Sequence, residues 1–151
     1  MNGLPKISNS HRFAASGETV SGSAPVIGFE RLLERIPENV DVNSLLPLSW
    51  AIRGTKDALG RPALEISVDG VFPLTCQRCL GRLDWTIKQT TTVLIASSET
   101  ELAALDDASE MEVVLCAGGI DAAALIEDEL LLALPFAPMH EEMDAQCAMN
   151  D

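Results

Sequence analysis

The stretch Thr75-Cys76-Gln77-Arg78-Cys79-Leu80-Gly81 separates two long segments in which apolar residues alternate with polar ones. Because side chains alternate between the two faces of a strand, this pattern predicts an antiparallel hairpin with the cysteines at its tip. Two cysteines separated by two residues in a sharp turn can present both sulfurs to one metal ion. Gly81 permits the left-handed backbone that such a turn often needs. The stretch therefore predicts a hairpin whose tip forms half of a metal site.

The alternation also says which face of the hairpin is buried. The first segment places one apolar set on a single face: Leu64, Ile66, Val68, Phe72, Leu74 and Cys76. The second segment does the same with Leu83, Trp85, Ile87, Val93 and Ile95. Gly70 and Pro73 interrupt the first segment, which indicates a bulge or bend and an edge position in the sheet. We expect Cys76 to share the buried face with the apolar set.

Other segments supply the remaining elements. Apolar residues at helical spacing predict a short helix from Phe29 to Ile36, which Pro37 ends. Alternation over Leu48–Arg53 predicts a further strand, and residues 112–116 can form a short one. Residues 97–110 are acidic and rich in alanine, and we expect at most one helical turn there. A run of strong helix formers, Ala122–Leu134, follows Asp121, which is a good N-cap.

These elements predict an α+β fold. We expect an antiparallel sheet of about four strands, with a C-terminal helix and a short N-terminal helix packed on it. Residues 1–25 are rich in Ser, Gly and Asn without periodicity, which predicts a flexible N-terminal arm. Residues 26–147 then form a single domain, and residues 148–151 are its C-terminal end. The sequence shows no secretory signal and no membrane span, so we expect a cytoplasmic protein with reduced thiols.

The charge of −13 is divided unevenly along the chain. Up to Lys88, ten Lys and Arg residues face nine Asp and Glu residues, a net charge of +1. From Gln89 onward there are fourteen acidic residues and no Lys or Arg, a net charge of −14. The acidic half is either a solvated face or a surface that attracts a basic partner and repels phosphate.

Two motifs together resemble one protein family. The first is Cys76-Gln77-Arg78-Cys79-Leu80 followed by an alternating strand. The second is Leu125–Pro135 followed by Pro138, His140 and Cys147. In this order and spacing, from about Phe29 to Cys147, they resemble the YceD family of large-ribosomal-RNA-subunit accumulation proteins. The resemblance implies a role in the synthesis, processing or stability of large-subunit (23S) rRNA, and it brings no established catalytic residues.

The cysteines admit more than one interpretation. Cys76, Cys79, His140 and Cys147 have the chemistry of a Cys₃His structural zinc site, although six residues separate His140 from Cys147. The alternative is two reduced thiols at a turn, together with two unrelated residues further along the chain. A redox motif would require the first cysteine at the start of a helix, whereas strands flank this one. We interpret Cys116 as a small buried residue in a strand.

Charged residues supply the other candidate sites. The candidate RNA-binding residues are the basic ones near the predicted sheet: Arg53, Lys56, Arg61, Arg78, Arg82 and Lys88. The candidate partner-binding residues are Glu127, Asp128 and Glu129 in the C-terminal helix. We expect a ribosome-assembly factor that acts by binding, with large-subunit rRNA precursor or basic ribosomal proteins on assembly intermediates as partners. The alternative is a metal-dependent hydrolase or nuclease that uses the acidic cluster, but His11 and His140 are its only neutral-pH bases.

Overall fold

The computed structural model describes residues 6–108, 110–116, 119–135 and 137–138. A five-stranded sheet forms its centre, in the order β2-β3-β4-β5-β6. The strands of this sheet are β2 (Thr19–Ala24), β3 (Leu48–Lys56), β4 (Pro62–Thr75), β5 (Arg82–Ala96) and β6 (Val113–Leu115). A two-stranded sheet pairs β1 (Lys6–Ile7) with β7 (Ile120–Asp121). The helices are α1 (Ser10–Ser16), α2 (Glu30–Leu33), α3 (Glu99–Ala108) and α4 (Ala122–Ala133), with two 3₁₀ turns at Val26–Gly28 and Val42–Ser44.

The long hairpin of β4 and β5 forms as the alternation predicts. Its register runs without interruption from Ala63 opposite Leu94 to Thr75 opposite Arg82, so β4 carries no bulge. The sequence predicted an edge position for this strand, and that prediction is correct only near Pro73. β4 is an interior strand over most of its length, but β3 ends its pairing at Asp69 and leaves the Pro73 level without a neighbour on that side. A residue without an N–H is tolerated there because no β3 carbonyl lies opposite it.

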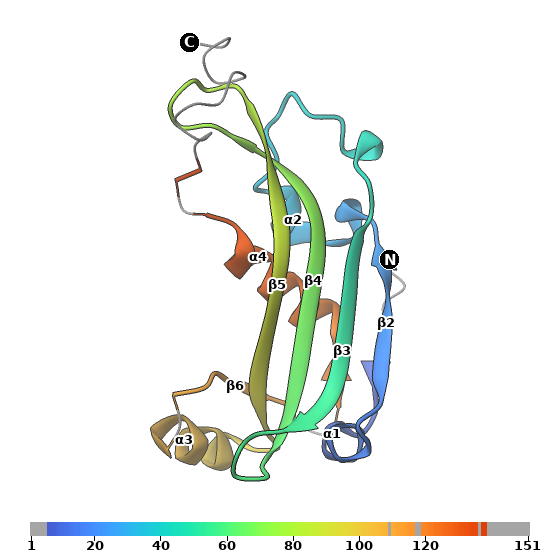
Figure 1. The fold of residues 1–151 in the computed structure, drawn as a ribbon, viewed down its shortest axis with the longest axis vertical. Helices are drawn as coiled ribbons and strands as arrows, with labels where there is room; N and C mark the ends of the chain where they lie inside the picture. The colour runs from blue at the N-terminus through green and yellow to red at the C-terminus, as the bar shows by residue number, and fades with distance from the viewer. Residues whose placement is uncertain (1–5, 109, 117–118, 136, 139–151) are drawn as a thin grey trace.

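Helices cover one face of this sheet and leave the other face open. In Figure 1, α2 and α4 lie behind the strands, on the side to which the apolar alternation of β4 and β5 points. The largest fully buried side chains of the core include Phe29, Ile66, Phe72 and Leu130. Asp121 caps α4 by accepting a hydrogen bond from the Ala124 N–H at 3.4 Å, as expected.

Residues 6–24 differ from the flexible arm that the composition predicts. They form β1, α1 and β2, and β2 pairs antiparallel with β3 along its whole length. Asn9 caps α1, and Gly17 ends it with a left-handed φ of 71°. A Cβ at Gly54 of β3 would collide with the Phe13 carbonyl, so glycine lets α1 pack directly on the strand. The cap and the two glycines are the local signals of this packing.

The C-terminal half also adds elements. α3 is a ten-residue helix where we expected one turn. β6 pairs with β5 in the parallel direction, so the sheet is mixed rather than purely antiparallel. The helix expected at Phe29–Ile36 keeps its buried face, with Phe29 and Leu32 in the core, but its α-helical part is four residues long and continues as 3₁₀-type turns. The fold is therefore α+β as predicted, with five strands in the main sheet instead of about four.

Membrane-spanning helices are absent from the part of the chain that the structure describes, since none of its helices combines the required length and apolarity.

Candidate functional site

The hairpin tip is a tight turn built around the two cysteines. The Cys76 N–H donates to the Gly81 carbonyl at 2.9 Å, and the Leu80 N–H donates to the Cys76 carbonyl at 2.8 Å. The Gly81 N–H donates to Cys79 Sγ at 3.4 Å. The Cys76 side chain is fully buried, whereas the Cys79 side chain is partly exposed. The turn thus orients at least one sulfur, that of Cys79, through a backbone hydrogen bond.

The left-handed residue of this turn is Leu80, with a φ of 63°, and not Gly81 as the sequence suggested. Leu80 is 73% exposed, so no burial of its side chain compensates for this conformation. A non-glycine residue in this region costs about 1–2 kcal/mol. Such strain persists only where the surrounding structure fixes it, as the hydrogen bonds from Cys76 to Gly81 do here.

A segment after α4 contacts the hairpin tip. The Gln77 N–H, inside the Cys-x-x-Cys motif, donates to the Pro138 carbonyl at 2.8 Å. This contact joins two segments about sixty residues apart in the chain, and a zinc site shared by Cys76, Cys79 and His140 would also require these segments to meet. His140 and Cys147, the other two predicted zinc ligands, lie outside the described residues. Among those that are described, no group of three or more His, Cys, Asp or Glu side chains could hold a metal ion.

Cys116 lies away from the tip, directly after β6 at the opposite end of β5. Its side chain is 4% exposed, and burial raises the pKa of its thiol. The Ser10 hydroxyl donates to its carbonyl at 3.3 Å, which links it to α1. This placement agrees with the interpretation of Cys116 as a core residue.

The six candidate RNA-binding residues do not come together. A strand of fifteen residues such as β5 spans roughly 50 Å, and these residues extend from the tip to the far end of the hairpin. Three of them pair with acids: Arg53 with Glu65 at 2.9 Å, Arg61 with Asp57 at 2.7 Å and Arg82 with Asp84 at 2.8 Å. Lys88 stands opposite Asp69 in the register of β4 and β5. Within the described part of the chain, Lys56, Arg78 and Lys88 make no ion pair.

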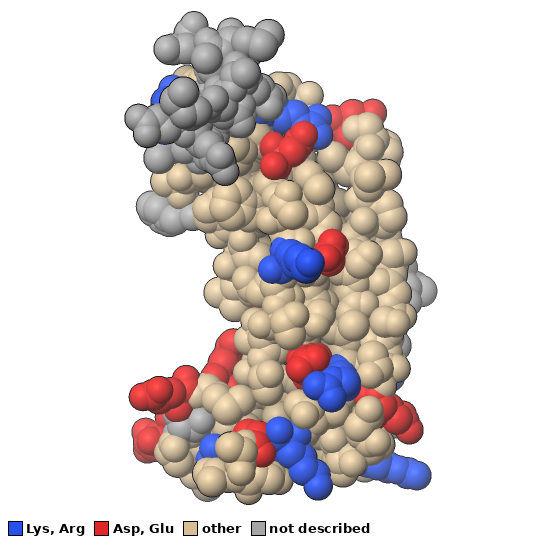
Figure 2. Space-filling view, in the orientation of Figure 1, with Lys and Arg blue, Asp and Glu red and all other residues tan. Residues whose placement is uncertain are grey.

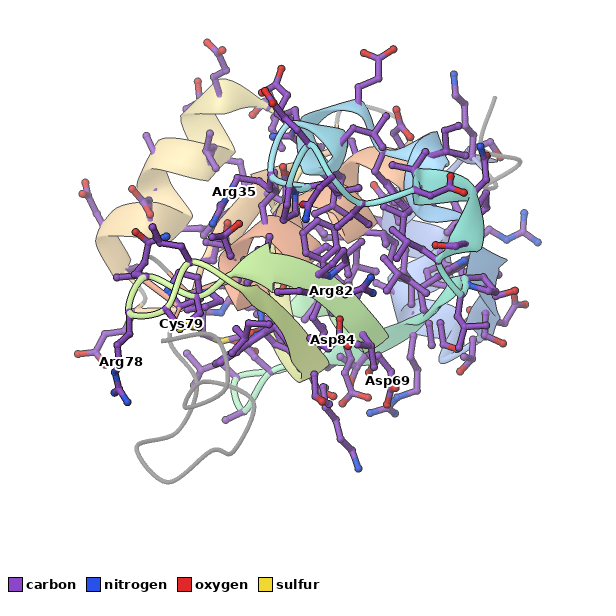
Figure 3. All side chains as sticks on the ribbon, turned by 90° about the horizontal axis from the view of Figure 1, so that it is seen from above. Arg35, Asp69, Arg78, Cys79, Arg82 and Asp84 are labelled. Carbon is purple, nitrogen blue, oxygen red and sulfur yellow. The ribbon has the colours of Figure 1, made fainter. Side chains whose placement is uncertain are left out.

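The open face of the sheet is consequently close to neutral. Figure 2 shows mostly uncharged residues on this face, with isolated basic side chains beside acidic ones. A shallow depression of about 310 Å³ crosses β3, β4 and β5 there, lined by small polar side chains that include Ser49, Ser67 and Thr90. Seen from above in Figure 3, Arg78 projects outward from the loop, away from Arg82 and Asp84. Arg78 is therefore the exposed cation at the tip.

The three candidate partner-binding acids of α4 have internal contacts. Arg31 Nε donates to Glu127 at 2.9 Å and its Nη2 donates to Asp128 at 2.6 Å, which joins α2 to α4. Hydrogen bonds to Asp128 and then Glu127 raise the pKa of Arg31. Glu129 is only 3% exposed and accepts a hydrogen bond from Gln89 Nε2 of β5 at 3.1 Å. Of the two α4 acids that pair with Arg31, Asp128 has the more exposed side chain, at 53% against 13% for Glu127.

Comparison with known proteins identifies the family. No solved structure matches the chain. The sequence model of the family described as large ribosomal RNA subunit accumulation protein YceD matches residues 64–151. The match begins at Leu64 rather than near Phe29, so it covers β4, the cysteine turn, β5 and all that follows, and leaves α1, β2, α2 and β3 outside. Because it spans more than half of the sequence, this chain belongs to the YceD family.

Proposed function

We propose that this chain supports the accumulation of large-subunit (23S) rRNA as an assembly factor that acts by binding, and that it reaches the rRNA through basic proteins of assembly intermediates. The family description supplies the process. Binding rather than catalysis is supported by the long, nearly neutral sheet face and by the engagement of the α4 acids with Arg31 and Gln89.

The observation that carries the preference for a protein partner is the pairing of cations with anions on the sheet. Arg53 and Arg82 each bind a neighbouring carboxylate, so the face offers no continuous positive surface to a phosphate backbone. The part of the chain from Gln89 onward has a net charge of −14, which repels RNA and attracts basic proteins. Charge complementarity of this kind mainly raises the rate of encounter and sets the register of binding.

The test compares naked 23S rRNA fragments with large-subunit assembly particles at matched salt. We expect weak binding to the naked RNA and stronger, salt-sensitive binding to the particles. Tight binding to naked RNA that Arg78→Glu combined with Arg82→Glu abolishes would contradict the proposal and would make the tip an RNA site. In cells, removal of the protein should lower 23S rRNA relative to 16S rRNA, and unchanged ratios would rule out the proposed process.

We also propose that the hairpin tip holds a structural zinc ion through Cys76 and Cys79, with His140 and Cys147 as the remaining ligands. Support comes from the Gly81 N–H on Cys79 Sγ and from the contact between Gln77 and Pro138. Pro138 precedes His140 by two residues, a reach of at most about 7 Å between their Cα atoms, so His140 is close enough in the chain to serve the turn. A zinc ion would fix the turn against the segment after α4 and contribute folding energy.

Elemental analysis of reduced, freshly purified protein should find about one zinc ion per chain. Cys79→Ser should lose the metal and thermal stability together, whereas Cys116→Ser should keep the metal. Metal-free protein of unchanged stability would leave the cysteines as two reduced thiols at a turn.

A further inference from the structure

In the described part of the chain, the outer edge of β5 has no partner strand along most of its length. β6 covers only Leu94–Ala96, while β5 begins at Arg82. Between these levels no strand pairs with β5 on that side within the described ranges. Figure 2 shows the outline of the molecule hollowed on the left, the side of β5 in Figure 1, above the acidic residues at the lower left.

The register identifies which backbone groups face this edge. The Leu94 N–H donates to the Glu112 carbonyl at 2.9 Å, and the Ala96 carbonyl accepts from the Cys116 N–H at 2.8 Å. Even-numbered residues of β5 therefore point their N–H and C=O groups toward β6. Because β5 has no bulge, the same direction holds further up the strand, at Thr86, Lys88, Thr90 and Thr92. The odd-numbered residues between them face β4.

The edge lacks most of the features that prevent strand addition. Natural sheets protect such edges with proline, bulges, very short strands or charged side chains, of which Lys is the commonest. The segment from Thr86 to Thr92 has no proline and no bulge, and Lys88 is its single charge. Four of its seven residues are β-branched threonines, which favour an extended backbone. An extended segment can thus add to this edge by ordinary ladder hydrogen bonds.

Acidic side chains surround the edge at its lower end. Glu112 directly precedes β6 and lies against Leu94, while Glu129 is held beside β5 by its hydrogen bond from Gln89. Partial burial raises the pKa of Glu112, which stays accessible to solvent, and the nearby charges of Glu129 and Asp128 raise it further. Neither Glu112 nor Glu129 has a cation partner in the described part of the chain. A cationic side chain on an added strand would relieve this repulsion.

We propose that the open edge of β5 binds an extended, Lys- and Arg-bearing protein segment as an added β-strand, with its cations directed to Glu112 and Asp128, whose side chains are exposed. Main-chain hydrogen bonds supply affinity in such a mode, and side chains of the added strand supply specificity. The choice of a basic partner rests on the proposed function, whereas the ability of the edge to accept a strand follows from the structure of β5 alone. Basic protein extensions are favoured over RNA because a ladder requires peptide groups and the surrounding charge is negative.

The probe is a capped ten-residue peptide of alternating lysine and valine, titrated into the full chain, with a glutamate–valine peptide as its control. Amide exchange should slow at Thr86, Lys88, Thr90 and Thr92 and stay unchanged at the odd-numbered residues between them. Protection at other positions, or equal binding of the two peptides, would overturn the proposal.

A matched pair of variants isolates the edge hydrogen bond. Thr90→Pro removes the outward N–H and should weaken the lysine–valine peptide at least about fivefold, the value of one hydrogen bond. Thr90→Val also loses the hydroxyl but keeps the backbone N–H, so it should bind the peptide nearly as tightly as the wild type. Ser21→Pro places proline on β2, at the other edge of the sheet, and controls for the presence of proline. Equal affinities for Thr90→Pro and Thr90→Val, with both variants folded by circular dichroism, would overturn the proposal.

Charge variants test the second part of the proposal. Glu112→Gln and Asp128→Asn together should weaken binding of the same peptide and reduce its salt dependence, while Glu99→Gln on α3 should not. If Thr90→Pro keeps its affinity for the peptide but loses affinity for rRNA fragments, the β5 edge binds RNA and the proposal is wrong. The two proposals can fail separately. If the peptide binds at β5 but cells without the protein accumulate 23S rRNA normally, the β5 edge is a binding site and the proposed function is wrong.

Discussion

The two faces of the sheet are built from the same strands but by different physical means. On the covered face, alternate residues of β4 such as Ile66 and Phe72 are completely buried on the side where the helices lie. On the open face, Glu65 pairs with Arg53, Ser67 meets the hydroxyl of Thr90, and Val71 meets solvent. The covered face supplies the stability that apolar burial gives, whereas the open face is kept neutral by cation–anion pairs. The fold therefore depends on one face and leaves the other face and the β5 edge available for contacts.

The sharpest test of this difference uses two adjacent residues of β4. Phe72→Ala should destabilise the protein by about 3–5 kcal/mol, because it removes a buried ring and leaves a cavity. Val71→Ala, at a position that is 47% exposed on the opposite face, should cost much less. Urea unfolding with comparable slopes measures both. Similar losses in the two variants would mean that the open face is covered in solution.

A second pair tests the helix that covers the sheet. Leu125 of α4 is 7% exposed and Leu132 is 64% exposed. Leu125→Ala should cost about 2–5 kcal/mol, and Leu132→Ala should change stability by roughly 0.5 kcal/mol or less. Thermal melts followed by circular dichroism distinguish them. A large effect at Leu132 would show that this side of α4 is buried against something in the intact protein.

A third prediction concerns Glu112, the residue directly before β6. Its pKa is raised above the ordinary value of 4.5, first by burial and then by Glu129 and Asp128. The folded chain therefore holds this proton more tightly than the unfolded chain does, so stability falls as pH rises through this range and stays lower above it. Glu112→Gln should be more stable than the wild type at pH 7 and should lose that advantage below pH 4.5.

Denaturation curves at both pH values measure this difference. Glu99→Gln on the exposed helix α3 is the control and should behave as the wild type at each pH. An advantage of Glu112→Gln that persists in acid would assign its effect to packing instead of ionisation.

The smallest effect should come from the open face. Ser67 and Thr90 approach to 3.2 Å through their hydroxyls in an exposed cross-strand pair. Ser67→Ala should change the free energy of unfolding by about 0.5 kcal/mol or less, because water replaces the lost partner. A loss comparable to that of Leu125→Ala would show that hydroxyl pairs on this face contribute to the fold.

Sequence reasoning succeeded where a local pattern controls the structure. The alternation around the cysteine turn predicted the β4–β5 hairpin and the buried position of Cys76, and Asp121 marked the start of α4. It was less successful for the candidate site. The spacing of Cys76 and Cys79 indicated their proximity in a turn, but not the strain at Leu80 or the contact between Gln77 and Pro138. The zinc set remains a prediction, since two of its residues lie outside the described ranges.

By itself, the sequence determined the hairpin, its tip, the apolar face and the C-terminal helix, because strand alternation, helix propensity and capping act over a few residues. Only the tertiary structure decided the rest. Residues 6–24 join the sheet through Gly54 of β3, and Arg31 binds two acids almost a hundred positions away. β6 pairs with the last residues of β5 and leaves the Thr86–Thr92 edge open. Those outcomes depend on which distant segments meet, and a pairing of that kind has no period along the chain.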